Sequence, residues 1–147
     1  PVRHSQGKVQ TDYSRLNQYE ATRRGSRVAL LGLGTFHHLA TEVADALKQQ
    51  LGVEATVVNP RYITGLDTAM LDSLKAGHQV VVTIEDGQLD GGFGEKIARY
   101  YGPTAVRVLN YGLKKEFVDR YDYAAMLSDS RLTAPQITAD VVSLLNE

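Results

Sequence analysis

The sequence predicts an α/β fold, a three-layer α/β/α sandwich in which helices cover both faces of a mostly parallel sheet. Short apolar runs rich in β-branched residues alternate with runs that keep helical spacing. Glycines lie at several of the boundaries between the predicted strands and helices. The chain has 147 residues, 43% of them hydrophobic and 22% charged, which is enough for one well-buried core. We therefore expect one domain over residues 18–147, preceded by a linker or extended arm at 1–17.

Five segments have the composition of strands. The strongest is 79–86, whose centre is β-branched throughout. Residues 27–34 are apolar on both faces, as in a buried parallel strand. Residues 18–24 alternate weakly and are typical of an edge strand. The other two predicted strands lie at 53–59 and 105–112.

Helices are expected between and after these strands. They lie at 36–52, 66–77, 91–102, within the mixed segment 115–130, and at 133–147. Their predicted N-caps are Thr35 for the first, Asp67 or Thr68 for the second, Asp90 for the third and Thr133 for the last. Right-handed crossovers would place these helices on both faces of the sheet.

Composition excludes several classes of function. The formal net charge of -1 argues against a nucleic-acid or anionic-membrane partner. The chain has no cysteine, so thiolate catalysis, disulfides and cysteine metal sites are excluded. No apolar run reaches the roughly 18 residues of a membrane span. A cytoplasmic location is therefore expected, and the start at Pro1 suggests a processed product or a piece of a longer chain.

Three stretches follow predicted parallel strands, at the edge where ligands of open sheets gather. "GLGTFHH" (32–38) begins like a dinucleotide fingerprint, but His37 stands where the third glycine belongs. A tight strand-to-helix turn explains it better. "NPRYITGLD" (59–67) contains Arg61, which would either hold a carboxylate or phosphate or brace a loop or an interface. "EDGQLDGGFG" (85–94) is discussed next.

The third stretch contains adjacent carboxylates at Glu85 and Asp86. The residues leave two alternatives open, a structural polar contact and a functional one. No nucleophile, base and orienting group come together in the sequence, so we predict no catalytic residue, no metal ligand and no cofactor-binding residue in this fragment. The adjacent His37 and His38 point about 100° apart on a helix and cannot chelate one metal together.

Five tyrosines gather in the second half of the chain. An aromatic ring with a polar tip favours a protein interface, so the sequence predicts a buried contact surface there. The residues are Tyr100, Tyr101, Tyr111, Tyr121 and Tyr123.

The order and spacing of four segments resemble the C-terminal domain of the transketolase family. The segments are "SRVALLGLGTFHHLATEVADAL", "VEATVVNPRYITGLD", "VVVTIEDGQLDGGFGEKIARYYG" and "VRVLNYGLKKEFVDRYD". The resemblance covers about residues 18–146. Within the family it is most similar to the 1-deoxy-D-xylulose-5-phosphate synthases, and it implies a five-stranded mixed sheet whose first strand, "YEATRR", is antiparallel.

The resemblance also implies a function for a longer parent. Such an enzyme uses thiamine diphosphate and Mg²⁺, both held by its first two domains, to join pyruvate to glyceraldehyde 3-phosphate with loss of CO₂. Its product, 1-deoxyxylulose 5-phosphate, feeds the biosynthesis of isoprenoids, thiamine and pyridoxal. The third domain would support a homodimer, contact the N-terminal domains of the same polypeptide, and be inactive and cofactor-free alone.

The resemblance also implies roles for single residues. Arg3, in "PVRHSQG", matches an arginine that holds the substrate phosphate just before this domain. Glu85 and Asp86 would face the cofactor-bearing domains. The alternatives are a transketolase or 2-oxo acid dehydrogenase β-chain, a stand-alone dimerising interaction module, and a small nucleotide binder that uses "GLGTF".

Overall fold

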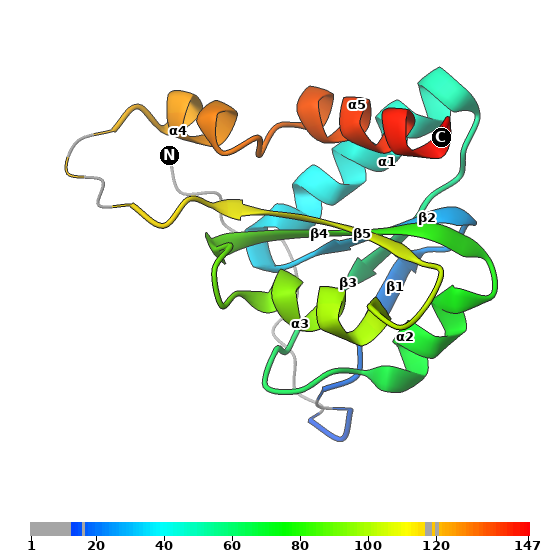
Figure 1. Ribbon diagram of the computed structural model, residues 1–147. Coiled ribbons are helices and arrows are strands. Elements are labelled where there is room, and N and C mark those ends of the chain that lie inside the picture. The colour runs from blue at the N-terminus through cyan, green and yellow to red at the C-terminus, as the bar shows by residue number, and fades with distance from the viewer. Residues whose placement is uncertain (1–12, 16, 117–118, 120) are drawn as a thin grey trace.

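The computed structural model describes residues 13–15, 17–116, 119 and 121–147, and these form a five-stranded sheet between two layers of helices (Figure 1). The three-layer α/β/α prediction is confirmed. Most of the predicted arm, including Arg3, lies outside the described residues. The strands are β1 (Glu20–Arg23), β2 (Arg27–Gly32), β3 (Thr56–Asn59), β4 (His78–Gln88) and β5 (Arg107–Leu113).

The sheet has the strand order β1-β3-β2-β4-β5. Only β1 runs antiparallel, against β3, and the other three pairs of neighbours are parallel. The antiparallel first strand implied by the family resemblance is therefore confirmed. β2 is the central strand, and Val28, Ala29, Leu30 and Leu31 are all 0% exposed. This explains why that segment is apolar on both faces.

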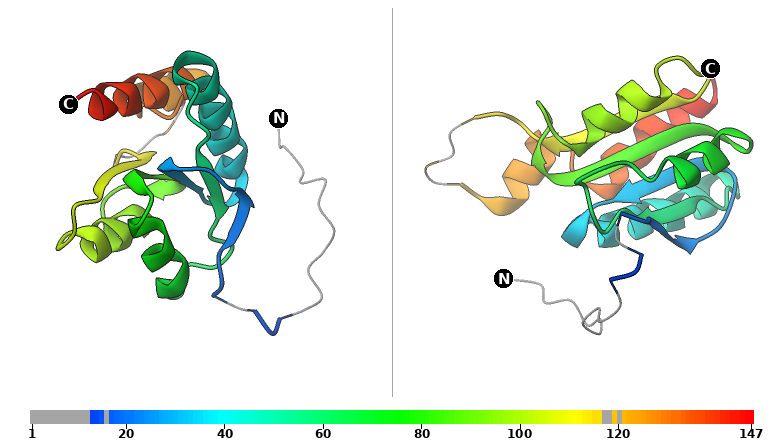
Figure 2. Two further views of the ribbon diagram at one scale, coloured as in Figure 1. Left: turned by 90° about the vertical axis from the view of Figure 1, so that its right-hand side faces the viewer. Right: turned by 90° about the horizontal axis from the view of Figure 1, so that it is seen from below.

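Helices cover the two faces in separate groups. α1 and α5 pack on one face, and α2 and α3 lie on the other (Figures 1 and 2). Within the described residues no helix is long and apolar enough to cross a membrane. The helices are η1 (Gly34–Phe36), α1 (His37–Leu51), α2 (Thr68–Lys75), α3 (Phe93–Tyr101), α4 (Tyr123–Asp129) and α5 (Ala134–Leu145).

Each face has its own apolar core, because alternate residues of a strand point to opposite faces. Leu30 and Val82 pack beneath α1 and α5, whereas Leu31 and Val81 pack against α2 and α3. These strand residues are 0% exposed. Two filled cores on one rigid sheet hold the loops at its ends in fixed positions.

The N-caps predicted from the sequence agree only in part with those of the structure. Of the two predicted caps of α2, Asp67 occupies the N-cap and accepts a hydrogen bond from the Met70 N–H, and Thr68 is the first helical residue. The prediction for Thr35 is wrong, because a 3₁₀ turn precedes α1 and places Phe36 at its N-cap. Thr133 occupies the N-cap position of α5, but its hydroxyl donates to the Gln136 side chain instead of accepting from the backbone.

Candidate functional site

The carboxyl ends of the four parallel strands meet at one edge of the sheet, together with residues 33–36, 60–67, 89–92 and 114–116. We call this region the carboxyl edge. All three glycine-containing stretches singled out in the sequence lie here. The Leu33 N–H donates to the carbonyl of Ile84 over 2.9 Å and so joins the β2–α1 loop to β4.

Glu85 is the central side chain of this edge, and it is 3% exposed. Its Oε2 accepts from the Phe93 N–H over 2.9 Å, and its Oε1 accepts from the Gly94 N–H over 2.8 Å. Both donors belong to the first turn of α3, where the helix dipole favours a negative charge. Glu85 therefore caps α3, and the predicted capping role of Asp90 is wrong.

Glycines make room for this carboxylate. A Cβ added at Gly92 would lie 2.6 Å from Glu85 Oε1, and one at Gly112 would lie 3.2 Å from Glu85 Cγ. At Gly94 a Cβ would lie 2.6 Å from Thr83 Oγ1. Contacts under 3.0 Å are essentially never seen for real Cβ atoms. Gly92 is therefore required by the packing around Glu85, and Gly94 by the close approach of α3 to Thr83.

A bulge in β4 turns Glu85 toward α3. Ile84 pairs with Tyr111 and Gln88 with Leu113, so β4 advances four residues while β5 advances two. The strand thus continues to Gln88, past the end at Asp86 expected from sequence. The bulge leaves Asp86 exposed while Glu85 is buried. Of the two carboxylates, only that of Asp86 is presented at the surface of the carboxyl edge.

This arrangement explains why "GGFG" is not a phosphate cradle. A helix N-terminus binds phosphate through backbone N–H groups, and two of those groups in α3 already donate to Glu85. At the other glycine turn, a Cβ on Gly32 would lie 2.6 Å from His37 Cα. Gly32 therefore allows close contact between strand and helix, which is the strand-to-helix turn expected there.

The three histidines of the described residues have local structural partners. His37 Nε2 lies 2.9 Å from Thr22 Oγ1, and His78 Nε2 lies 2.8 Å from Thr56 Oγ1. Burial lowers the pKa of His37 and of His78. His38 pairs with Glu42 on the surface of α1. No group of three or more His, Asp or Glu side chains in the described part of the chain could hold a metal ion.

Arg61 lies at the carboxyl edge, directly after β3, in the left-handed backbone region with φ 62°. Its side chain is 18% exposed, and Nη1 lies 3.7 Å from Glu20 Oε2. Nη2 donates to the Arg15 carbonyl over 3.4 Å. Through these long contacts Arg61 connects the β3–α2 loop to the segment that leads into β1. They also hold a guanidinium at the edge where ligands of such sheets bind.

The five tyrosines do not form a single surface. Tyr101 and Tyr111 are buried in the cores on opposite faces of the sheet. The Tyr101 hydroxyl donates to the Leu71 carbonyl over 2.8 Å, and that of Tyr111 donates to Asp140 Oδ2 over 2.8 Å. Burial raises the pKa of both phenols. Of the five tyrosines, only Tyr121 and Tyr123, at 59% and 57% exposed, are exposed at the surface, and they lie near α4.

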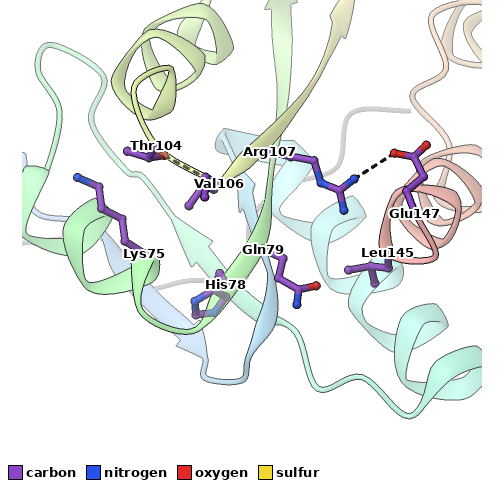
Figure 3. Close-up of a pocket in the computed structure, with 9 residues that line it drawn as sticks. Lys75, His78, Gln79, Thr104, Val106, Arg107, Leu145 and Glu147 are labelled. Carbon is purple, nitrogen blue, oxygen red and sulfur yellow. Dashed lines mark hydrogen bonds and ion pairs between the residues drawn. The ribbon is translucent and has the colours of Figure 1, made fainter.

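A cavity of about 480 Å³ lies at the opposite edge, beside the amino ends of β4 and β5 (Figure 3). Two basic side chains that line the cavity bind backbone carbonyls near the ends of helices. His78 Nδ1 donates to the Leu74 carbonyl near the end of α2, and Arg107 donates to Leu144 and pairs with Glu147. The Arg107 cation is favourable beside a helix C-terminus, and His78 satisfies a carbonyl near the end of α2 as a hydrogen-bond donor. These contacts account for both side chains without a ligand.

The sheet order and the two helix layers define an α/β sandwich domain whose glycine turns are structural joints. The family model for the transketolase C-terminal domain matches residues 17–137. The chain belongs to this family. The match spans most of the chain and includes all three stretches of the carboxyl edge.

Curated relatives and solved structures agree with this assignment. A 1-deoxy-D-xylulose-5-phosphate synthase of Crocosphaera subtropica is 37% identical over 127 residues, which are 85% of this chain and 20% of the relative. A probable 1-deoxy-D-xylulose-5-phosphate synthase 2 of Oryza sativa is 40% identical over 126 residues, 82% of this chain and 17% of the relative. The chain thus spans about a fifth of the length of these relatives.

Among solved structures, a split-gene transketolase described as an inactive beta4 tetramer has a TM-score of 0.78 and 25% identity. The similarity covers 88% of this chain and 43% of that one. A transketolase from Campylobacter jejuni has a TM-score of 0.62 at 17% identity, which shows the shared fold.

Proposed function

We propose that the chain is the C-terminal domain of a 1-deoxy-D-xylulose-5-phosphate synthase-like transferase that uses thiamine diphosphate. The parent would condense pyruvate with glyceraldehyde 3-phosphate and release CO₂ in the cytoplasm. The observation that carries the proposal is identity of 37% and 40% to two synthases over more than four fifths of the chain. The transketolase structure, by comparison, is 25% identical.

In this proposal the domain serves dimer assembly and active-site support. The carboxyl edge would meet the preceding domains of the same polypeptide, with Asp86 as the exposed carboxylate of its bulge. Arg61 would hold the phosphate of the acceptor substrate from this edge, because a guanidinium donates two parallel hydrogen bonds to phosphate oxygens. Arg3, outside the described residues, is the second proposed phosphate ligand.

The described residues do not fit thiamine diphosphate and Mg²⁺. They contain no cluster of three carboxylate or histidine side chains for the metal. Two first-turn N–H groups of α3 that would suit a diphosphate donate to Glu85. We therefore assign both groups to the preceding domains. Calorimetric titration of the 147-residue chain with thiamine diphosphate and Mg²⁺ should give no binding heat, and micromolar binding would contradict this assignment.

The activity is tested on a polypeptide that joins this domain to its own N-terminal domains. Incubation with pyruvate and glyceraldehyde 3-phosphate should yield 1-deoxyxylulose 5-phosphate and CO₂. An Arg61→Ala variant should raise KM for the phosphorylated acceptor by about tenfold or more, with KM for pyruvate little changed. Equal effects on both substrates would indicate that Arg61 only braces the loop.

The second candidate is a transketolase or 2-oxo acid dehydrogenase β-chain, which the similarity to the split-gene transketolase favours. The same polypeptide would then transfer two-carbon units from ketose phosphates, or acyl groups to a lipoyl acceptor. Activity with these substrates and none with pyruvate plus glyceraldehyde 3-phosphate would support this candidate over the synthase. A stand-alone interaction module would show no activity in any of the three assays.

A further inference from the structure

The turn that follows β3 holds Arg61 in an unusual backbone conformation. Its φ of 62° lies in the left-handed region that favours glycine. The side-chain Oδ1 of Asn59, two residues earlier, accepts a hydrogen bond from the Arg61 N–H over 3.0 Å. The Tyr62 N–H donates to the Pro60 carbonyl over 2.6 Å. A side chain that accepts from the backbone two residues ahead forms an Asx turn, so Asn59 fixes the conformation of Arg61.

The contacts of the Arg61 side chain do not account for this conformation. A guanidinium has five N–H donors, and among the described residues that of Arg61 makes one hydrogen bond, of 3.4 Å, to the Arg15 carbonyl. Arg131 is also left-handed, with φ 57°, but its guanidinium donates twice to Asp140, over 2.6 and 3.2 Å. A purely structural turn would adopt the conformation of Arg61 at lower cost with glycine. Strained residues of this kind occur at ligand sites.

The antiparallel pairing of β1 with β3 places a carboxylate beside this guanidinium. Glu20 faces Asn59 in the register of the two strands. Its Oε2 lies 3.7 Å from Arg61 Nη1, and its side chain is 57% exposed. An ion pair that is long and exposed contributes little. A phosphate dianion carries more charge and accepts two parallel hydrogen bonds from a guanidinium, so it would displace Glu20 from Arg61.

We propose that Asn59 is the positioning residue of Arg61 at the acceptor site, and that Glu20 is the anion that the acceptor phosphate displaces. This inference rests on the proposed function, in which Arg61 binds that phosphate. Without the Asx turn, Arg61 relaxes to negative φ, which redirects its Cα–Cβ bond and moves the guanidinium. The turn therefore determines how well the enzyme distinguishes a phosphorylated acceptor from an unphosphorylated one.

The test compares two acceptors in the polypeptide that joins this domain to its own N-terminal domains. With pyruvate as donor, kcat/KM is measured for glyceraldehyde 3-phosphate and for glyceraldehyde. Asn59→Ala should lower kcat/KM for the phosphorylated acceptor about fivefold, through KM. The value for glyceraldehyde should stay within about twofold, because this acceptor has no phosphate for Arg61 to bind. Equal losses with both acceptors overturn the positioning role.

Two further variants give graded and opposite effects. Asn59→Ser keeps an oxygen that accepts from the Arg61 N–H more weakly, so the loss for the phosphorylated acceptor should shrink to about twofold. Glu20→Gln removes the competing charge and should lower KM for that acceptor about twofold. No recovery in Asn59→Ser overturns the positioning role. An unchanged or raised KM in Glu20→Gln overturns the competing role of Glu20.

Thr64 provides the matched control in the same loop. Its hydroxyl donates to Asn17 Oδ1 over 2.6 Å, so Thr64→Val removes a contact between the loop and the segment before β1 without changing the Asx turn. The ratio of the two kcat/KM values should stay within about twofold of the native ratio. A loss equal to that of Asn59→Ala would mean that any loosening of the loop has this effect, and it would overturn the proposal.

Arg61→Ala separates this inference from the proposed function. If Arg61→Ala lowers kcat/KM equally for both acceptors, Arg61 does not bind the phosphate, and the proposed phosphate ligand fails together with its positioning. If Arg61→Ala affects only the phosphorylated acceptor while Asn59→Ala affects neither, the phosphate ligand stands and the inference about Asn59 is overturned. We expect both variants to affect the phosphorylated acceptor alone, with the larger loss in Arg61→Ala.

Discussion

Two glycine-containing turns at the carboxyl edge look alike in sequence, but different interactions stabilise them. At the β2–α1 turn, Gly32 lets the backbone of α1 approach the strand, and α1 begins on a 3₁₀ turn with no side-chain cap. At the β4–α3 turn, Gly92 leaves room for the buried carboxylate of Glu85, which caps the helix. The β2–α1 turn therefore depends on close backbone packing, and the β4–α3 turn depends on a charged carboxylate.

The comparison shows that a glycine-rich turn does not by itself indicate a ligand. Glycine removes a Cβ, and what occupies the space decides the role of the turn. Backbone fills it at Gly32, and the protein's own carboxylate fills it at Gly92. The anion preferred by the N-terminus of α3 is therefore supplied from within the domain.

The largest expected effect concerns the turn that depends on close packing. Gly32→Ala would place a Cβ 2.6 Å from His37 Cα and 2.8 Å from the Phe36 carbonyl oxygen, both backbone atoms that cannot rotate away. We expect the free energy of unfolding to fall by about 3 kcal/mol or more, measured by urea denaturation.

Gly34→Ala in the same turn is the control. Gly34 has open space around its Cβ position but a positive φ of 58°, so the cost is conformational strain of about 1 kcal/mol. Equal losses for the two variants would mean that close packing at Gly32 is not the reason for its glycine.

The next effect concerns the turn that depends on charge. Glu85→Gln keeps the size of the side chain but can accept from only one of the two N–H groups. We expect a loss of about 2 kcal/mol in the free energy of unfolding. Asp86→Asn, one residue along and exposed, should change it by less than about 0.5 kcal/mol. A larger loss at Asp86 than at Glu85 would reverse the roles assigned to them.

The smallest effect is a dependence on pH that involves His37, beside the Gly32 turn, and His78, at the start of β4. The pKa values of His37, at the start of α1, and His78 are lowered by burial, so the unfolded chain binds more protons. Their contribution to stability is present above the unfolded pKa of about 6.5 and is lost as pH falls below it.

Denaturation midpoints measured between pH 7.5 and 5 should therefore decrease toward acid. His37→Gln and His78→Gln should each reduce the slope in this range. A slope unchanged in both variants would show that neither imidazole carries the effect.

The fold could be predicted from sequence more completely than the carboxyl edge. Strand and helix periods located all five strands, and the cap of α2 was narrowed to Asp67 or Thr68, of which Asp67 directly precedes the helix. The antiparallel direction of β1 came only from the family resemblance, since a four-residue edge strand has no directional signal. The spacing of apolar residues shows which side chains of a strand are buried. That spacing is similar whether the strand runs parallel or antiparallel to its neighbour.

Capping at α3 could not be predicted because it depends on a bulge. Asp90 lies near the helix start in sequence, whereas Glu85 is eight residues from Phe93 and reaches it only after β4 bends. The available signal is a pair of glycines near one acidic residue, Gly92 before α3 and Gly112 on β5. Local rules for caps consider only the adjacent residues.

The most direct test of the central claim is amide hydrogen exchange at Phe93 and Gly94. The account predicts strong protection of both amides in the native chain and a fall of about 30-fold in Glu85→Gln, which corresponds to about 2 kcal/mol. Amides at the start of α1 should fall less. Unprotected Phe93 and Gly94 amides in the native chain, or protection that does not depend on Glu85, would contradict the account.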